Sequence, residues 1–250
     1  IANTAFGFTA GFVGEEVRKE VEQLGVKAEF ISLDEGVSRI NLKLKSIDGT
    51  EINGRGPKIP REAVDALMTQ LDRLGADDTL VLAGSIPASM PDDIYQKIME
   101  RLDGRDVRIV VDATKDLLLN VLGHHPFLIK PNNHELGELF GVTLENDQQI
   151  EQYARKLQDM GAQNVLISMA ADGAMLITKE GEMYRIGIAK GKTVNSVGAG
   201  DSMVAGFLAS YTKEQNYQKA LKYGTAAGGA TAQSEGLATI GLVEKLYKLL

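Results

Sequence analysis

The stretch at residues 195–201 reads Asn-Ser-Val-Gly-Ala-Gly-Asp and runs directly into an apolar helical segment. Gly198, Ala199 and Gly200 carry little or no side chain, so backbone N–H groups can approach a ligand oxygen while the helix adds its positive end. Such a loop suits a phosphoryl group. An unpaired carboxylate would repel a phosphate, so Asp201 makes chemical sense as a general base that takes a proton from an attacking hydroxyl. If the pattern stood alone, a glycine turn followed by a helix-capping aspartate would be the better interpretation.

A second candidate site lies at residues 130–136, which follow a short apolar segment and open a predicted helix. Asn132 and Glu135 have the spacing of a capping box, in which each side chain bonds a backbone N–H at the helix start. At the carboxyl end of a strand, the same two side chains can also hold waters around a Mg²⁺ ion that bridges nucleotide phosphates. From these residues alone, capping is the stronger interpretation.

Small residues elsewhere in the chain are candidates for bordering a nucleotide. The loop at residues 170–173 follows a predicted strand at 164–168, and it either faces phosphates or is an ordinary approach to a hairpin. The predicted helix at 217–233 is rich in glycine and alanine. Such residues leave room for a flat ring such as adenine, although close packing against another helix is the commoner reason for them.

The pattern of the chain from Pro60 onward predicts the scaffold for these candidates. Helical segments alternate with short apolar strands, which is typical of βα units around a mainly parallel sheet. Ligands bind at the carboxyl ends of the strands in such sheets. We therefore expect Ser85, Asp112 and residues 130–132, which follow predicted strands, to lie along one edge of the sheet.

Before this α/β part, the pattern predicts a small antiparallel unit. Residues 27–33, 37–45 and 50–53 read as strands, with a hairpin turn at Asp48 and Gly49. Alternation along the middle strand places Arg39, Asn41, Lys43 and Lys45 on one face, and Ile40, Leu42 and Leu44 on the other. The basic face can cover an anionic ligand, for which Arg39 beside Asn41 is the best candidate.

The composition is that of an ordinary globular protein with a sizeable core, since 44% of the 250 residues are hydrophobic and 24% are charged. The net charge of −7 argues against a nucleic-acid partner. The absence of cysteine and the presence of only three histidines disfavour thiolate and zinc sites, so we expect any metal to be an oxygen-bound ion such as Mg²⁺. Because the sequence has neither a long apolar run nor a leader, we expect a cytoplasmic protein with no membrane partner.

Four motifs, in order along essentially the whole chain, resemble the ribokinase-like carbohydrate kinases, in particular the branch of 1-phosphofructokinases and tagatose-6-phosphate kinases. They are Ser38-Arg39-Ile40-Asn41, Gly84-Ser85-Ile86-Pro87, the stretch from Lys130-Pro131-Asn132 to Glu135-Leu136, and residues 195–201. The resemblance implies an α/β fold of three layers, with a mainly parallel sheet between helices and a small antiparallel β lid. We expect a core of residues 1–26 and 57–250, and a lid of residues 27–56.

The resemblance also implies roles for the residues in these motifs. Asp201 is then the catalytic base, and the amides of Gly198, Ala199 and Gly200 form an anion hole for the γ-phosphoryl group of ATP. Asn132 and Glu135 order the waters around Mg²⁺. The remaining site residues bind ATP or the sugar substrate. Those at the ATP phosphates are Ser168, Ala170, Asp172 and Gly173, and those at the adenine are Thr225 and Gly228. Those at the sugar substrate are Arg39, Asn41 and Ser85, of which Arg39 and Ser85 contact the phosphate of the sugar.

The activity that the resemblance implies is transfer of the γ-phosphoryl group of ATP to fructose 1-phosphate, giving fructose 1,6-bisphosphate. Tagatose 6-phosphate is the alternative acceptor, and a non-catalytic sensor of sugar phosphates or nucleotides is the alternative from another class, against which the intact Asp201 argues. A dinucleotide oxidoreductase is disfavoured, because no Gly-x-Gly-x-x-Gly turn follows a first strand. A homodimer through the apolar face of the lid is a further expectation.

Members of the resembled family carry about fifty further residues upstream, including an acidic first strand and a Gly-Gly-Lys-Gly-like sugar-binding loop. Nothing in this sequence matches them. We expect the sequence to omit that segment, because Ile1 falls in a predicted strand whose neighbours would otherwise be unpaired. The alternative is a fragment that binds nucleotide but phosphorylates poorly. The one departure within the motifs is Ala170, where many relatives have glycine, and we expect it to tighten the nucleotide loop.

Overall fold

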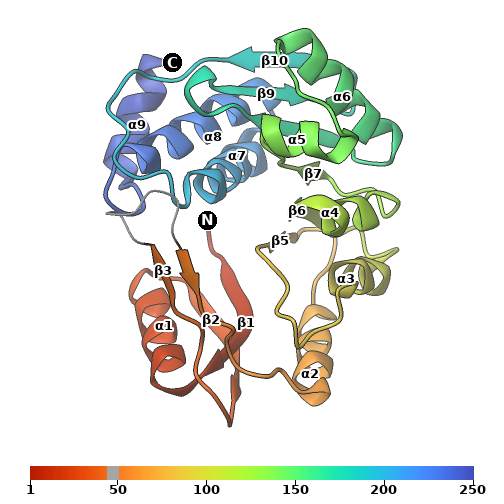
Figure 1. Cartoon of the computed structure of the whole chain (residues 1–250), viewed down its shortest axis with the longest axis vertical. Coiled ribbons are helices and arrows are strands. Elements are labelled where there is room, and N and C mark those ends of the chain that lie inside the picture. The colour runs from red at the N-terminus through yellow and green to blue at the C-terminus, as the bar shows by residue number, and fades with distance from the viewer. Residues whose placement is uncertain (44–50) are drawn as a thin grey trace. The chain divides into compact units, whose positions relative to one another are not determined.

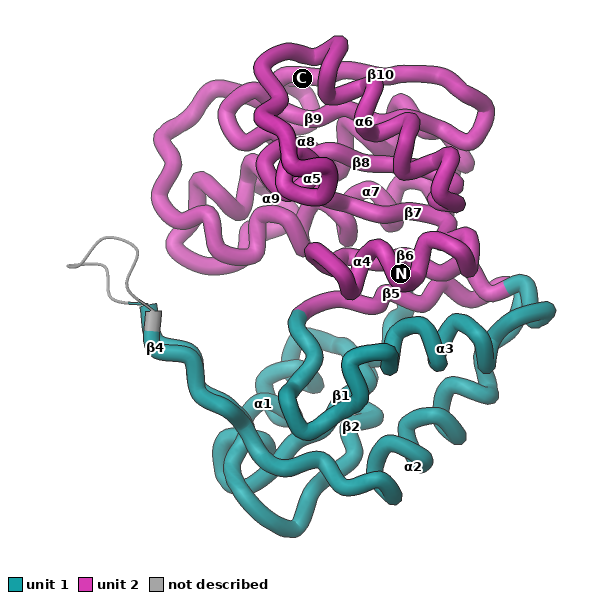
Figure 2. The backbone as a smooth tube through the Cα atoms, turned by 45° about the vertical axis from the view of Figure 1, so that its right-hand side comes forward, with its two compact units in different colours: residues 1–76, 85–106 teal, residues 77–84, 107–250 magenta. Residues whose placement is uncertain are grey.

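The computed structural model describes residues 1–43 and 51–250 (Figure 1). The predicted strand positions Leu44 and Lys45 and the predicted turn at Asp48 and Gly49 lie outside the described residues. The chain forms two compact units (Figure 2): residues 1–76 and 85–106 make unit 1, and residues 77–84 and 107–250 make unit 2. The division into a core and a lid at residues 27 and 56 stays a prediction.

Unit 1 begins with a βαβ arrangement. Strands β1 (Thr4–Ala10) and β2 (Lys27–Leu33) pair in parallel, and helix α1 (Gly11–Gln23) connects them. Parallel strands need such a crossover, because a tight turn can join only antiparallel neighbours. The expectation that residues 27–33 belong to the small antiparallel unit is therefore wrong, since the periodicity of a strand does not reveal which neighbour it pairs with.

The small antiparallel sheet itself is confirmed, as strands β3 (Asn41–Lys43) and β4 (Glu51–Asn53). Unit 1 continues with helices α2 (Arg61–Leu71) and α3 (Ile94–Leu102), each of which buries one apolar face. Arg101 of α3 donates two hydrogen bonds to the carboxylate of Asp72, which follows α2 directly. This ion pair lowers the pKa of Asp72 and ties the two helices together.

Unit 2 contains a sheet of six strands in the spatial order β10-β9-β8-β7-β6-β5. The strands are β5 (Thr79–Ala83), β6 (Arg108–Asp112), β7 (Leu128–Ile129), β8 (Asn164–Ser168), β9 (Ala174–Ile177) and β10 (Met183–Ile186). Strands β5 to β8 are parallel, whereas β9 and β10 are antiparallel to their neighbours. The central strands are apolar along their length, as expected where helices cover both faces. The mainly parallel sheet is thus confirmed.

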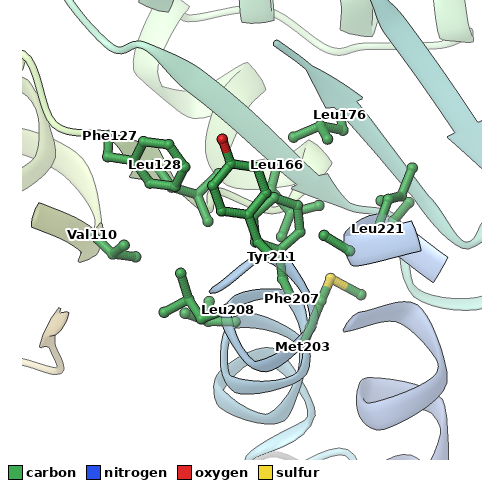
Figure 3. Close-up of a cluster of buried hydrophobic side chains, with 13 residues drawn as sticks. Val110, Phe127, Leu128, Leu166, Leu176, Met203, Phe207, Leu208, Tyr211 and Leu221 are labelled. Carbon is green, nitrogen blue, oxygen red and sulfur yellow. The ribbon is translucent and has the colours of Figure 1, made fainter. Parts of the chain in front are cut away.

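Helices form a layer on each side of this sheet. They are α4 (Lys115–Leu122), α5 (Asn133–Phe140), α6 (Asp147–Asp159), α7 (Ala199–Glu214), α8 (Tyr217–Ala232) and α9 (Ile240–Leu249). Helices α4, α5 and α6 lie on one face, and α7 and α8 on the other (Figure 1). Figure 3 shows Phe207 and Tyr211 of α7 among Leu128, Leu166 and Leu176 of the strands. Among the described residues, no helix is long and apolar enough to cross a membrane.

The glycines of α8 let it pack closely against α7. A Cβ atom on Gly224 would lie 2.7 Å from the carbonyl oxygen of Met203, and one on Gly228 would lie 2.9 Å from that of Ala199. Both distances are too short for a real side chain. The small residues of α8 therefore serve helix packing, and Gly228 fixes the position of the first turn of α7.

Candidate active site

The loop before α7 has the geometry that anion binding requires. Gly198 precedes the helix in the left-handed conformation, with φ +78°, which favours glycine. The N–H of Ala199 donates to the carbonyl oxygen of Ser196 at 3.2 Å, whereas the N–H groups of Gly200 and Asp201 find no acceptor among the described residues. Two free amides at the positive end of a 16-residue helix can bind an anion.

A buried lysine lies directly beneath this loop. Lys130, which follows β7, is 7% exposed, and its ammonium lies 3.3 Å from a carboxylate oxygen of Asp112 at the end of β6. A Cβ atom on Gly200 would lie 3.1 Å from the same ammonium. The absence of a side chain at Gly200 thus allows a positive charge to approach the first turn of α7.

Three carboxylates interact with one another near this ion pair. Burial raises the pKa of Asp112; Lys130 lowers it, and repulsion from Asp201 and Glu135 raises it further. The three acids come from the end of β6 and from the first turns of α5 and α7. Because the three carboxylates repel one another, the region suits a further cation.

Asn132 and Glu135 form the predicted capping box at the start of α5. The side-chain oxygen of Asn132 accepts a bond from the N–H of Glu135 at 2.8 Å, and the Glu135 carboxylate accepts one from the N–H of Asn132, also at 2.8 Å. The capping interpretation is confirmed. Both side chains also line a pocket of about 300 Å³, together with Thr114, Lys115, His134 and Glu138.

These residues fit a Mg²⁺ ion that is held through water. Within the part of the chain that the structure describes, no three acidic or histidine side chains converge into a direct metal cage. Mg²⁺ keeps most of its waters and usually takes only one or two protein carboxylates together with substrate phosphates. The side chains of Asn132 and Glu135 each accept one hydrogen bond in the helix cap. Their oxygens retain further lone pairs that can accept hydrogen bonds from such waters.

The candidate nucleotide loop lies beside the candidate metal residues. Ser168 at the end of β8 forms a parallel bridge with Asn132, and its N–H donates to the carbonyl oxygen of Pro131 at 3.2 Å. Residues Ala170–Asp172 then make a single 3₁₀ turn, in which Ala170 has φ +45°. Gly173 has φ +97°, and a Cβ atom there would lie 2.0 Å from the carbonyl oxygen of Ile186. Only glycine fits at this position.

The adenine candidates on α8 have different surroundings. Thr225 is 2% exposed, and its hydroxyl has no hydrogen-bond partner among the described residues, which is uncommon for a buried polar group. Gly228 packs against the first turn of α7. The structure therefore gives Gly228 a packing role, while the Thr225 hydroxyl is a buried polar group with no partner among the described residues.

Two of the three substrate candidates meet in unit 1. The guanidinium of Arg39 donates to the hydroxyl of Ser85 at 3.3 Å, although the residues are 46 positions apart in the sequence. Both side chains are exposed. Asn41 is in β3 opposite Asn53, and no bond joins its side chain to the other two among the described residues. A guanidinium beside a hydroxyl is a suitable pair for a phosphate.

Sequence reasoning placed Asp112 and Lys130 at the sheet edge but gave neither a role. Their importance depends on their contact with each other and with Gly200, residues that are distant in the sequence. The available signal was a lysine that ends a strongly apolar segment, Phe127-Leu128-Ile129-Lys130. Such a lysine must find a partner when it is buried.

The sequence and the fold are similar to those of known proteins. Residues 2–244 match the model of the pfkB family of carbohydrate kinases. The chain is 44% identical over 246 residues to 1-phosphofructokinase of Bacillus subtilis, covering 98% of this chain and 80% of the relative. It is 33% identical over 244 residues to D-tagatose-1-phosphate kinase of Bacillus licheniformis, covering 97% and 80%. Phosphofructokinase-2 from Escherichia coli in complex with fructose-6-phosphate has the same fold, with TM-score 0.87, 21% identity, and coverage of 99% of this chain and 81% of that one.

Proposed function

The chain belongs to the pfkB family of carbohydrate kinases and is thus a phosphotransferase with an alcohol group as acceptor, and we propose that its acceptor is fructose 1-phosphate. The γ-phosphoryl group of ATP is transferred to a hydroxyl of this sugar phosphate, and the product is fructose 1,6-bisphosphate. The relative at 44% identity carries the name of this activity. The observation in the structure that supports a phosphorylated acceptor most directly is the bond between Arg39 and Ser85.

At the acceptor, Arg39 and Ser85 hold the phosphate that is already on the sugar. A guanidinium gives charge and a planar pair of donors, and the hydroxyl adds one more donor. Asn41 contacts the sugar from β3. A free sugar would leave the exposed Arg39 without its anion, so this pair favours a phosphorylated acceptor over an unphosphorylated one.

At the transferring group, Asp201 takes the proton from the attacking hydroxyl. Negative charge builds on the γ-phosphoryl oxygens during transfer. The loop of Gly198, Ala199 and Gly200 leads into α7, and the free N–H groups of Gly200 and Asp201 stabilise this charge together with the positive end of the helix. The ammonium of Lys130, paired with Asp112, lies beneath Gly200 on the same side.

On the nucleotide side, Ser168, Ala170, Asp172 and Gly173 line the phosphates of ATP. Asn132 and Glu135 hold the waters of Mg²⁺, which neutralises phosphate charge when it is bound. Support for this arrangement comes from the bridge between Asn132 and Ser168, which puts the two motifs side by side. Thr225 and Gly228 of α8 border the adenine, and Gly228 lets α8 pack close to the first turn of α7.

A second candidate acceptor is tagatose 1-phosphate, because a relative at 33% identity is named for it. Tagatose 6-phosphate, the acceptor expected from the resemblance, stays a prediction. All three are ketohexose monophosphates, so Arg39 and Ser85 serve each of them in the same way. Discrimination then depends on where the free hydroxyl lies relative to Asp201.

The apolar side of β3 and β4 is a surface for a second copy of the chain. Ile40, Leu42 and Ile52 are 61%, 50% and 58% exposed, and Leu42 lies opposite Ile52 across the two strands. Such a patch on a two-stranded sheet can pair with its own copy about a two-fold axis. We expect Leu42→Lys to give a monomer by light scattering, and an unchanged mass for the variant and the wild type would contradict the dimer.

The function is tested with a coupled ADP-release assay on the full chain. The acceptors are fructose 1-phosphate, tagatose 1-phosphate, tagatose 6-phosphate and free fructose, each with ATP and Mg²⁺. We expect turnover with fructose 1-phosphate to exceed that with free fructose by at least about a hundredfold in kcat/KM, since a lost charged contact costs a factor of ten or more. Equal rates with the free sugar would contradict a phosphosugar kinase.

A further inference from the structure

We propose that Arg185, in strand β10, is a positioning residue for the nucleotide. Its side chain lies at the candidate nucleotide loop, although no motif singled it out. It holds the turn at Ala170–Asp172 in one conformation and so presents two backbone amides to the phosphates. This inference rests on the proposed function of the same loop.

The contacts of Arg185 reach three elements at once. Its Nε donates to a carboxylate oxygen of Asp147 at 2.9 Å, in the first turn of α6. One Nη donates at 2.7 Å to the carbonyl oxygen of Asp172, and at 2.7 Å to that of Ile186. The side chain is 27% exposed, so water screens these bonds only in part. Arg185 therefore ties the turn to both a helix and a strand.

The turn needs such support because its backbone conformation is unfavourable. Ala170 has φ +45°, a region that non-glycine residues rarely adopt. Gly173 has φ +97° and lies against the carbonyl oxygen of Ile186, one of the two carbonyls that Arg185 binds. The guanidinium thus fixes both sides of this close approach. Without it, the turn can relax to more ordinary backbone angles.

The hydrogen bonds inside the turn leave specific donors free. The N–H of Asp172 donates to the carbonyl oxygen of Met169, and the N–H of Gly173 donates to that of Ala170. The N–H groups of Ala170 and Ala171 find no acceptor in the described ranges, 1–43 and 51–250. Successive free amides of this kind bind phosphate oxygens. Since Arg185 fixes the peptide that ends the turn, it also fixes the direction of these two amides.

Charge is a second reason for an arginine here. The carboxylate of Asp172 would repel a nucleotide phosphate on the same loop. The guanidinium bonds the backbone carbonyl of that very residue and offsets part of the repulsion. A neutral side chain at position 185 would leave the repulsion between Asp172 and the phosphate at its full strength.

The chain provides a matched control for this contact. Arg155, in α6, donates hydrogen bonds to the carboxylate of Glu151 in the same helix. It also donates to the backbone carbonyl oxygen of Gly181, in the turn between β9 and β10. The bonds of Arg155 thus lie at the turn of the β9–β10 hairpin, whereas those of Arg185 lie at the other end of β10, beside the nucleotide loop. Arg155→Ala removes the same kinds of bonds without touching residues 170–173.

The experiment compares Arg185→Ala, Arg185→Lys and Arg155→Ala with the wild type, using the full chain. We measure KM for ATP, KM for fructose 1-phosphate, and the dissociation constant of ADP by calorimetry. For Arg185→Ala we expect about a tenfold rise in KM for ATP and in the ADP dissociation constant, as for loss of a charged hydrogen bond. The KM for the sugar should change by less than about twofold, and Arg185→Lys should restore part of the nucleotide affinity.

Several outcomes would overturn the inference or the function separately. If Arg185→Ala and Arg155→Ala have the same ADP dissociation constant, Arg185 has no role beyond the hairpin and the inference fails alone. If the wild type binds ADP but turns over no acceptor, the proposed function fails. The ADP dissociation constants of the variants still test the role of Arg185. If the wild type binds no ADP, both fail. Should Arg185→Ala not fold by circular dichroism, Arg185→Lys and Arg185→Gln carry the same comparison.

Discussion

The ammonium of Lys130 lies 3.3 Å from a carboxylate oxygen of Asp112, and both side chains are largely buried at the edge of the sheet. Because Lys130 also approaches Gly200, this pair links the end of β6 to the start of α7. It places the ion-pair partner of Asp112 beneath the loop that we propose for the transferring phosphoryl group.

The first prediction concerns the pH dependence of stability at Asp112. Burial raises the pKa of its carboxyl above the ordinary value of 3.8, so the folded protein holds this proton more tightly than the unfolded chain. The resulting stabilisation is complete below pH 3.8 and is lost as the pH rises through the raised pKa. Asp112→Asn has no such loss. The free energy of unfolding of the wild type minus that of the variant should therefore fall as the pH rises above about 4, as measured by urea unfolding, and a flat or rising difference would contradict the raised pKa.

The second prediction concerns the space that Gly200 leaves for Lys130. A Cβ atom in Gly200→Ala would lie 3.1 Å from the ammonium and 3.3 Å from the Cε atom of Lys130, so the lysine must shift. We expect kcat to fall about tenfold, since a charge near the transferring group moves, while KM for the sugar phosphate stays within about twofold. Gly241→Ala, the matched control at the second residue of α9, has no atom within 4 Å of its added Cβ and should leave kcat unchanged. Equal kcat values for the two variants would show that Gly200 is only a turn residue.

The third prediction concerns the contact between Arg39 and Ser85. Arg39→Lys and Ser85→Ala should each raise KM for fructose 1-phosphate about tenfold and leave KM for ATP unchanged, because each loses one contact to the sugar phosphate. The two changes should be non-additive in a double-mutant cycle, since the side chains touch at 3.3 Å. Arg61→Lys, which changes an arginine at an exposed position of α2, is the control. A rise in KM for ATP instead would place these residues at the nucleotide.

The fourth prediction concerns Gly173. Ala in its place must adopt φ +97° with its Cβ 2.0 Å from the carbonyl oxygen of Ile186. Gly173→Ala should lower the free energy of unfolding by about 3 kcal/mol or more, because strain and overlap add. At Gly181, φ is +83° but nothing lies within 4 Å, so Gly181→Ala should cost only about 1 kcal/mol. Similar losses in urea unfolding would mean that the close approach to Ile186 is unimportant.

Much of unit 2 could be predicted from the sequence, because its signals are local. Alternating apolar strands and helices indicated the mainly parallel sheet, and the spacing of Asn132 and Glu135 indicated the capping box that the structure contains. Local patterns do not state which strands pair. For that reason residues 27–33 were placed in an antiparallel unit, although they pair in parallel with β1.

The site was harder to predict where it depends on long-range contacts. Lys130, Asp112 and Gly200 are far apart in the sequence and meet only in the folded sheet. Arg185 belongs to none of the motifs. Its proposed role depends on hydrogen bonds to the backbone carbonyl oxygens of Asp172 and Ile186, which cannot be predicted from residue types. In α8, glycine permits both packing and ligand approach, and only the distance from Gly228 to the carbonyl of Ala199 favours packing.

The most direct test of the central claim is kcat for Asp201→Asn with ATP and fructose 1-phosphate, measured beside the dissociation constant of ADP. Asparagine keeps the shape of aspartate but cannot take the proton of the attacking hydroxyl. We expect kcat to fall by about a thousandfold or more, with the ADP dissociation constant within about threefold of the wild type. If Asp201→Asn keeps wild-type kcat, Asp201 is not the base and the account of the transfer at α7 is wrong.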